Sequence, residues 1–154
     1  MDLVTQIETN SVQETEAFGA QLAQTMCDNV TLPPFIALYG DLGVGKTAFV
    51  RGFASVIAPN SLVRSPTFAL VNEYRAKPRS LFHFDMYRIE DEDDLYSIGF
   101  YDYADRNGIC LVEWSEKIPY ALPSRYLRID IEKTDPERPD RRAITVRLIG
   151  EDNK

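Results

Sequence analysis

Residues 40–47 read Gly40-Asp41-Leu42-Gly43-Val44-Gly45-Lys46-Thr47, which fits the pattern G-x-x-x-x-G-K-[ST]. The apolar run Phe35–Tyr39 precedes this stretch and predicts a buried strand, and a helical pattern from Thr47 to about Ile57 follows it. In such a phosphate-binding loop, backbone N–H groups and the helix N-terminus face phosphate oxygens. We therefore expect Lys46 to reach the β- and γ-phosphates of a nucleotide and the Thr47 hydroxyl to bind Mg²⁺.

A phosphate loop works with carboxylates that stand at the ends of neighbouring strands, where they hold the metal ion and orient the nucleophile. The segment Ile109-Cys110-Leu111-Val112-Glu113 gives four apolar residues followed by an acid. This pattern makes Glu113 the first candidate for binding the metal ion or a metal-bound water. The alternative is an ordinary acid at the exposed end of a strand.

A second acidic candidate lies in the segment Leu81–Arg88. Strand periodicity puts Phe82, Phe84 and Met86 on one face and His83, Asp85 and Tyr87 on the other. A polar face inside a covered sheet should line a wet cleft. We therefore expect Asp85 to act as a general base or to support the metal ion, with His83 orienting Asp85 or the attacking water. A structural hydrogen-bond network between His83 and Asp85 is the alternative.

The rest of the chain alternates strand and helix signals. Ser11 and Glu14 form a capping-box pattern before a helix that runs to about Asp28, and the segments 126–133 and 143–149 predict an antiparallel hairpin. We expect a single domain, residues 1–154, with a three-layer α/β fold of the P-loop NTPase type. Its central sheet should be mostly parallel, with the hairpin at one side. The strand order is not readable from these patterns.

Composition and charge exclude several classes of protein. The net charge is −7 and the pI is about 4.7, which disfavours autonomous binding to a nucleic-acid backbone, although residues 46–88 are locally basic. Two cysteines and one histidine exclude a disulfide scaffold and a structural zinc site. We find neither a signal peptide nor an apolar run of bilayer length, and we expect a cytoplasmic protein with no membrane contact.

Four landmarks occur in order along the chain and together resemble one family. They are the phosphate loop 40–47, Ser65-Pro66-Thr67-Phe68, His83-Phe84-Asp85-Met86-Tyr87-Arg88, and Cys110-Leu111-Val112-Glu113-Trp114. This combination resembles the TsaE (YjeE) family, a bacterial P-loop ATPase of tRNA threonylcarbamoyladenosine biosynthesis. The string H-x-D-x-Y-R is its most specific element. Phe68 departs from the tyrosine that often follows Ser-Pro-Thr in the family, a change that should not alter the chemistry.

The resemblance implies a function that spacing alone does not give. Members of the family hydrolyse ATP with Mg²⁺ and support the proteins TsaB and TsaD, which transfer a threonylcarbamoyl group to the adenosine at tRNA position 37. The protein would meet tRNA only through that complex. The roles that the resemblance implies are Mg²⁺ binding for Thr47 and Glu113, hydrolysis for Asp85, a switch segment for Thr67, proximity to the nucleotide for Trp114, and contacts to the base or sugar for Ser11 and Arg141.

Other readings of the same motifs stay open at this point. From spacing alone, Thr67 lies in a proline-containing turn that enters a strand. The chain could be a nucleotide-dependent assembly switch without productive hydrolysis. It could also be a small-molecule kinase, for which only Arg138, Arg141 and Arg142 offer a lid. A GTPase is the least favoured of these functions, because there is no N-K-x-D motif and Asp105-Arg106-Asn107-Gly108 precedes a strand.

Overall fold

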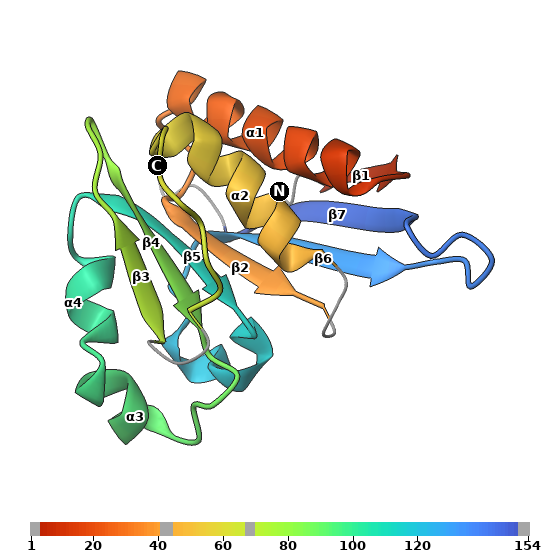
Figure 1. Cartoon of the computed structure of the whole chain (residues 1–154). Helices are drawn as coiled ribbons and strands as arrows, with labels where there is room; N and C mark the ends of the chain where they lie inside the picture. Colours follow the sequence, from red (N-terminus) through yellow and green to blue (C-terminus); the bar gives the residue numbers. More distant parts are fainter. Residues whose placement is uncertain (1–3, 41–44, 67–69, 151–154) are drawn as a thin grey trace.

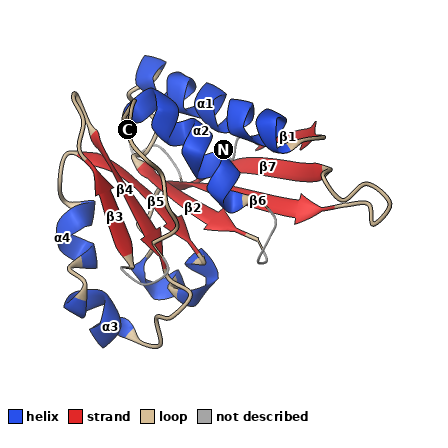
Figure 2. Cartoon of the chain, in the orientation of Figure 1, coloured by secondary structure: helices blue, strands red, loops and turns tan. Residues whose placement is uncertain are grey.

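The computed structural model shows a mixed α/β fold built on one seven-stranded sheet (Figures 1 and 2). It describes residues 4–40, 45–66 and 70–150. The elements follow in the order β1 (Val4–Thr9), α1 (Val12–Asp28), β2 (Phe35–Tyr39), α2 (Lys46–Ile57), β3 (Val71–Tyr74), β4 (Ser80–Asp85), α3 (Glu92–Ser97), α4 (Phe100–Ala104), β5 (Gly108–Glu113), the 3₁₀ helices η1 (Ser115–Lys117) and η2 (Pro119–Ala121), β6 (Tyr126–Lys133) and β7 (Arg142–Ile149).

The strand order is β1-β7-β6-β2-β5-β4-β3, and β2, the strand before the phosphate loop, lies at the centre. Within the described chain, the pairings β6–β2, β2–β5 and β5–β4 are parallel, whereas β1–β7, β7–β6 and β4–β3 are antiparallel. The predicted C-terminal hairpin is confirmed. The prediction of a mostly parallel sheet is correct only for the four central strands. Residues 75–79 between β3 and β4 are too few for the crossover that parallel pairing requires, so β3 turns back along β4.

Helix α1 begins where the sequence predicts it. The Ser11 hydroxyl accepts a hydrogen bond from the Glu14 N–H at 3.1 Å, and the Glu14 carboxylate accepts one from the N–H of Asn10. The first bond satisfies a donor that the first turn of a helix leaves without a partner, and the second holds the residue before the N-cap. Of the helices within the described ranges, none combines the length and the apolar character that crossing a membrane requires.

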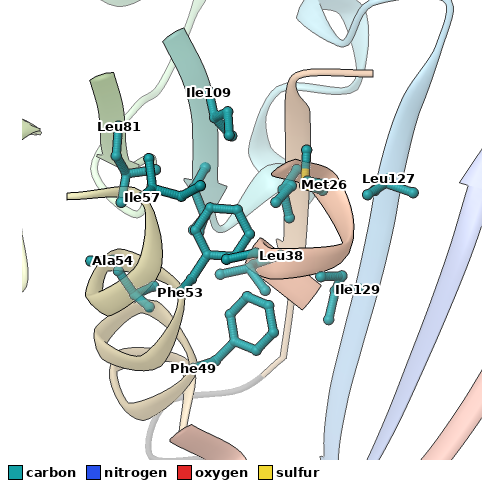
Figure 3. Packing of buried hydrophobic residues seen from close by; sticks show 14 of the residues in the cluster. Met26, Leu38, Phe49, Phe53, Ala54, Ile57, Leu81, Ile109, Leu127 and Ile129 are labelled. Carbon is teal, nitrogen blue, oxygen red and sulfur yellow. The ribbon is translucent and has the colours of Figure 1, made fainter. Parts of the chain in front are cut away.

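Successive side chains of the central strands point to opposite faces of the sheet, and each face carries its own apolar core. Ile36 and Leu38 of β2 pack with the side chains of α1 and α2, and Figure 3 shows Phe49 and Phe53 of α2 next to Leu38. Because side chains alternate between faces, Phe35 of β2 points to the opposite core. That core contains residues of α3 and α4, which lie away from α1 and α2 in Figure 1, so the protein has three layers.

Helices α1 and α2 pack closely because each has a glycine at the contact. A Cβ atom on Gly52 would lie 1.8 Å from the carbonyl oxygen of Glu16, and one on Gly19 would lie 2.3 Å from the carbonyl oxygen of Phe49. Backbone atoms cannot rotate away as a side chain does. These two positions therefore fix the distance between α1 and the helix that follows the phosphate loop.

Replacing Gly52 with alanine is expected to lower the free energy of unfolding by about 1–3 kcal/mol or more, because the added methyl group forces the two helices apart. Alanine favours a helix over glycine by about 1 kcal/mol, so helix propensity acts in the opposite direction. Denaturant unfolding of both proteins measures the difference. Equal or greater stability of the variant would show that the helices do not pack this closely.

Candidate active site

Three buried charged side chains stand at the carboxyl ends of the central strands and at the start of the helix that follows β2. Gly40 follows the end of β2, and α2 begins at Lys46. Strands β4 and β5 run parallel to β2 and end at Asp85 and Glu113, which pair directly across the ladder. Lys46, Asp85 and Glu113 are only 5%, 6% and 5% exposed. Burial of three charged groups at one edge is unusual outside paired or functional sites.

The two carboxylates lie on the face of the sheet that α2 covers. Leu81 of β4 and Ile109 of β5 belong to the core beneath α2, as Figure 3 shows. His83 and Asp85 follow Leu81 at intervals of two, and Glu113 follows Ile109 by four residues, so all three share that face. The predicted polar face of β4 is confirmed for His83 and Asp85, whereas Tyr87 lies beyond the end of the strand. The expected wet cleft does not reach His83, which is completely buried.

His83 pairs with Glu113. The Nε2 atom of His83 lies 2.5 Å from Oε2 of Glu113, and His83 is completely buried. The sequence analysis linked His83 to Asp85 or to the attacking water and missed this pair. His83 stands opposite Leu111, two residues before Glu113, so the contact crosses diagonally between neighbouring strands. No pattern in the sequence gives this contact without the strand order.

Asp85 is held at the turn that follows β4. Its Oδ1 atom accepts a hydrogen bond from the N–H of Tyr87 at 3.0 Å. The next residue, Met86, donates its N–H to the carbonyl of Glu113 at 3.0 Å. This turn ties the end of β4 to the end of β5. The Asp85 carboxylate is therefore fixed beside Glu113 by backbone hydrogen bonds.

Lys46 contacts the residue that follows β2 and the residue that follows β5. Its ammonium group donates a hydrogen bond to the carbonyl of Gly40 at 2.7 Å and lies 4.2 Å from the ring centroid of Trp114. Trp114 adopts a left-handed backbone conformation (φ 58°, ψ 42°), which turns the chain after Glu113. The Tyr87 ring lies 4.9 Å from the indole, between centroids. A cation–π contact and one carbonyl thus hold the buried ammonium group.

The N-terminus of α2 completes this edge. Gly45 precedes the helix with φ 103°, a conformation that favours glycine, and Thr47 is half-buried in the first turn. The first N–H groups of a helix have no intrahelical partner, so this end can bind an anion. Two sets of predicted site residues lie outside the described residues: the loop residues Asp41, Leu42, Gly43 and Val44, and Thr67.

A shallow pocket continues from Gly45 toward the start of α1 and the hairpin. Its lining comprises Ser11, Val12, Thr15, Gly45, Ala48, Asp140 and Arg142. The structure thus brings the predicted Ser11 next to the phosphate loop. The predicted Arg141 instead forms an ion pair with Glu8, and its neighbour Arg142 lines the pocket. Arg142 begins β7 and Arg141 is the last residue of the loop before it, so the sequence alone could not choose between the two arginines.

The residues at this edge fit a bound magnesium ion. Within the described ranges no group of three or more histidine, cysteine or acidic side chains could hold a metal ion. A nucleotide-bound Mg²⁺ needs fewer protein ligands, because phosphate oxygens and waters supply most of its octahedral shell. The Glu113 carboxylate and the Thr47 hydroxyl offer the hard oxygen ligands that such an ion prefers.

Comparison with known proteins gives the family. The family model described as "Threonylcarbamoyl adenosine biosynthesis protein TsaE" matches residues 9–144. A relative from Haemophilus influenzae, called tRNA threonylcarbamoyladenosine biosynthesis protein TsaE, is 38% identical over 88% of this chain and 83% of its own length. A Bacillus subtilis protein of the same name is 40% identical over 75% of this chain and 70% of its own length.

A solved structure agrees with the sequence comparison. The crystal structure of Bacillus subtilis YdiB superposes with a TM-score of 0.77 and 31% identity, over 97% of this chain and 88% of that one. The family model covers most of the chain, including Ser11, Lys46, Asp85 and Glu113. The chain therefore belongs to the TsaE family, whose members take part in tRNA threonylcarbamoyladenosine biosynthesis.

Proposed function

We propose that this protein is a Mg²⁺-dependent ATPase with a P-loop NTPase fold. Its ATP hydrolysis would support turnover of a TsaB–TsaD complex that forms threonylcarbamoyladenosine at tRNA position 37. The observation that carries the proposal is that Asp85 and Glu113 end neighbouring strands as buried, paired positions, and that the buried Lys46 of the G-x-x-x-x-G-K-T motif contacts Trp114, the residue after Glu113. A cation and two carboxylates at a helix N-terminus suit phosphoryl chemistry.

Each residue has a distinct task in this proposal. Lys46 exchanges the Gly40 carbonyl and the Trp114 ring for the β- and γ-phosphate oxygens, and N–H groups of α2 and the loop bind the same phosphates. Thr47 and Glu113 hold Mg²⁺, which when bound neutralises charge on the β- and γ-phosphates. Asp85 orients the attacking water and accepts its proton. Thr67, Asp41, Leu42, Gly43 and Val44 are assigned to the switch and the loop by motif and resemblance.

The proposed partners follow from the family. The names of the relatives place them in a tRNA modification pathway, and the −7 charge of this chain suits a protein that meets tRNA through other proteins rather than directly. We propose TsaB and TsaD as these proteins and the cytoplasm as the compartment. ATP is the proposed nucleotide.

ATP turnover with Mg²⁺ tests the proposal, measured for the protein alone and with TsaB and TsaD. Low turnover that rises with the partners and disappears without Mg²⁺ is the expected result. Unchanged turnover on adding the partners would contradict the coupling. Formation of the modified nucleoside at an equal rate with a non-hydrolysable ATP analogue would instead favour an assembly switch, and a phosphorylated metabolite among the products would favour a kinase.

The arginine at the shallow pocket gives a separate prediction. Replacing Arg142 with alanine is expected to weaken ATP binding by about tenfold or more, because one hydrogen bond to a charged ligand contributes about 1.5–3 kcal/mol. Arg141→Ala is the matched comparison, since it removes the same group one residue away and breaks the ion pair with the exposed Glu8. Titration calorimetry measures the ATP affinity of both variants. A larger loss of affinity in Arg141→Ala would assign the nucleotide contact to Arg141.

A further inference from the structure

The buried histidine beneath the site has one nitrogen in use and one without a partner. Nε2 of His83 contacts Oε2 of Glu113 at 2.5 Å, whereas Nδ1 has no hydrogen-bond partner among the described residues. His83 is 0% exposed and lies in β4 between the buried apolar residues Phe82 and Phe84. A buried polar atom without a partner costs free energy, and an aliphatic side chain here would avoid that cost. The contact with Glu113 is what distinguishes histidine from such a side chain.

The contact fixes where the imidazole carries its proton. A proton on Nδ1 would find no acceptor among the described residues, whereas a proton on Nε2 has Oε2 of Glu113 at 2.5 Å. Nε2 must therefore be the protonated nitrogen and donate to Oε2 of Glu113. Nδ1 then carries a lone pair and no proton, so it needs no acceptor.

Glu113 needs an anchor because another acid stands beside it. Asp85 is the direct partner of Glu113 across the parallel ladder, and both side chains are on the face that α2 covers. Two carboxylates on neighbouring strands repel each other in a buried environment. A hydrogen bond to Oε2 holds one of the two Glu113 oxygens in place, and a metal ligand needs only the other.

We infer that His83 is a positioning residue: its Nε2–H holds Oε2 of Glu113 so that the other carboxylate oxygen is presented to a nucleotide-bound Mg²⁺. This inference rests on the proposed function, in which Glu113 holds the metal ion. Groups that orient a metal ligand from behind typically change metal affinity by about 10–100-fold when they are removed. The role is one of orientation, since His83 is completely buried and contacts the ligand Glu113.

Two substitutions of similar polarity separate positioning from folding. In His83→Gln the amide nitrogen reaches the place of Nε2, whereas in His83→Asn it reaches only the place of Nδ1. Trp114, the single tryptophan of the chain, lies beside Lys46 and reports nucleotide binding by its fluorescence. We expect His83→Gln to keep the wild-type Mg²⁺ requirement for ATP binding. His83→Asn should raise the Mg²⁺ concentration at half-saturation by about 10–100-fold.

A second measurement uses the wild-type protein and needs no nucleotide. His83 is the only histidine, so a long-range ¹H–¹⁵N NMR spectrum of the imidazole ring contains one pair of ring nitrogens. The expected spectrum is that of the Nε2–H tautomer, and it should change in Glu113→Gln. This measurement decides the pairing even if His83→Asn fails to fold.

The outcomes distinguish this inference from the proposed function. An Nδ1–H tautomer, or an unchanged Mg²⁺ requirement in a folded His83→Asn variant, would overturn the positioning role alone. Wild-type protein that binds ATP equally well with and without Mg²⁺ would contradict the proposed function itself. The Nε2–H tautomer together with rescue by glutamine and loss with asparagine would support both.

Discussion

Replacing Asp85 with asparagine is expected to lower ATP turnover by about 10²–10⁴-fold, the range that removal of a general base produces. The amide oxygen can still accept the hydrogen bond from the N–H of Tyr87, so the turn after β4 should persist. The substitution removes the group that accepts the proton and keeps the size and shape of the side chain. Nucleotide affinity should therefore stay close to that of the wild type, and the loss should appear in kcat.

The control for Asp85→Asn is a carboxylate in the same sheet but away from the site. Glu73 of β3 stands opposite Phe82, three residues before Asp85 in β4, and forms ion pairs with Arg75 and Arg106. Glu73→Gln removes a negative charge at a distance from Lys46 and should leave turnover unchanged. Wild-type kcat in Asp85→Asn would eliminate Asp85 as the base and leave Glu113 as the other buried acid that the structure describes at this edge.

Replacing Lys46 with methionine is expected to lower turnover by about 10²–10³-fold, the loss seen when one preorganised donor to a developing charge is removed. The methionine keeps the length of the buried stem and removes the ammonium group that is held by Gly40 and Trp114. Because removal of the cation leaves the buried Asp85 and Glu113 at this edge without its charge, we expect the nucleotide-free variant to be less stable, and turnover is compared at a temperature at which circular dichroism shows both proteins folded. Loss of turnover would then not be due to unfolding.

Turnover assays and Trp114 fluorescence measure the effect of this substitution. Without the ammonium group, the fluorescence change on adding ATP should become smaller, since Lys46 no longer leaves the indole ring when phosphate binds. Lys77→Met, which removes an exposed cation between β3 and β4, is the matched control and should behave as the wild type. If Lys46→Met bound and hydrolysed ATP normally, the loop would not be a phosphate site.

The local elements and the positions of the acids were predictable from the sequence. The apolar run Phe35–Tyr39 is strand β2, the capping pattern at Ser11 begins α1, and Asp85 and Glu113 end strands β4 and β5. These features depend on neighbours a few residues away: periodicity, capping hydrogen bonds and turn residues. The sheet as a whole was less predictable, because antiparallel pairing at both sides makes it mixed rather than mostly parallel.

By itself, the sequence determined the order of strand, loop and helix around Lys46 and the two acids that accompany it. Only the tertiary structure decided that β4 and β5 are neighbours, that His83 meets Glu113 across 30 residues of chain, and that Arg142 rather than Arg141 lines the pocket beside Gly45. The reason is physical. Strand order and register arise from how the two cores pack on the sheet, and no local pattern encodes which strand will lie beside another.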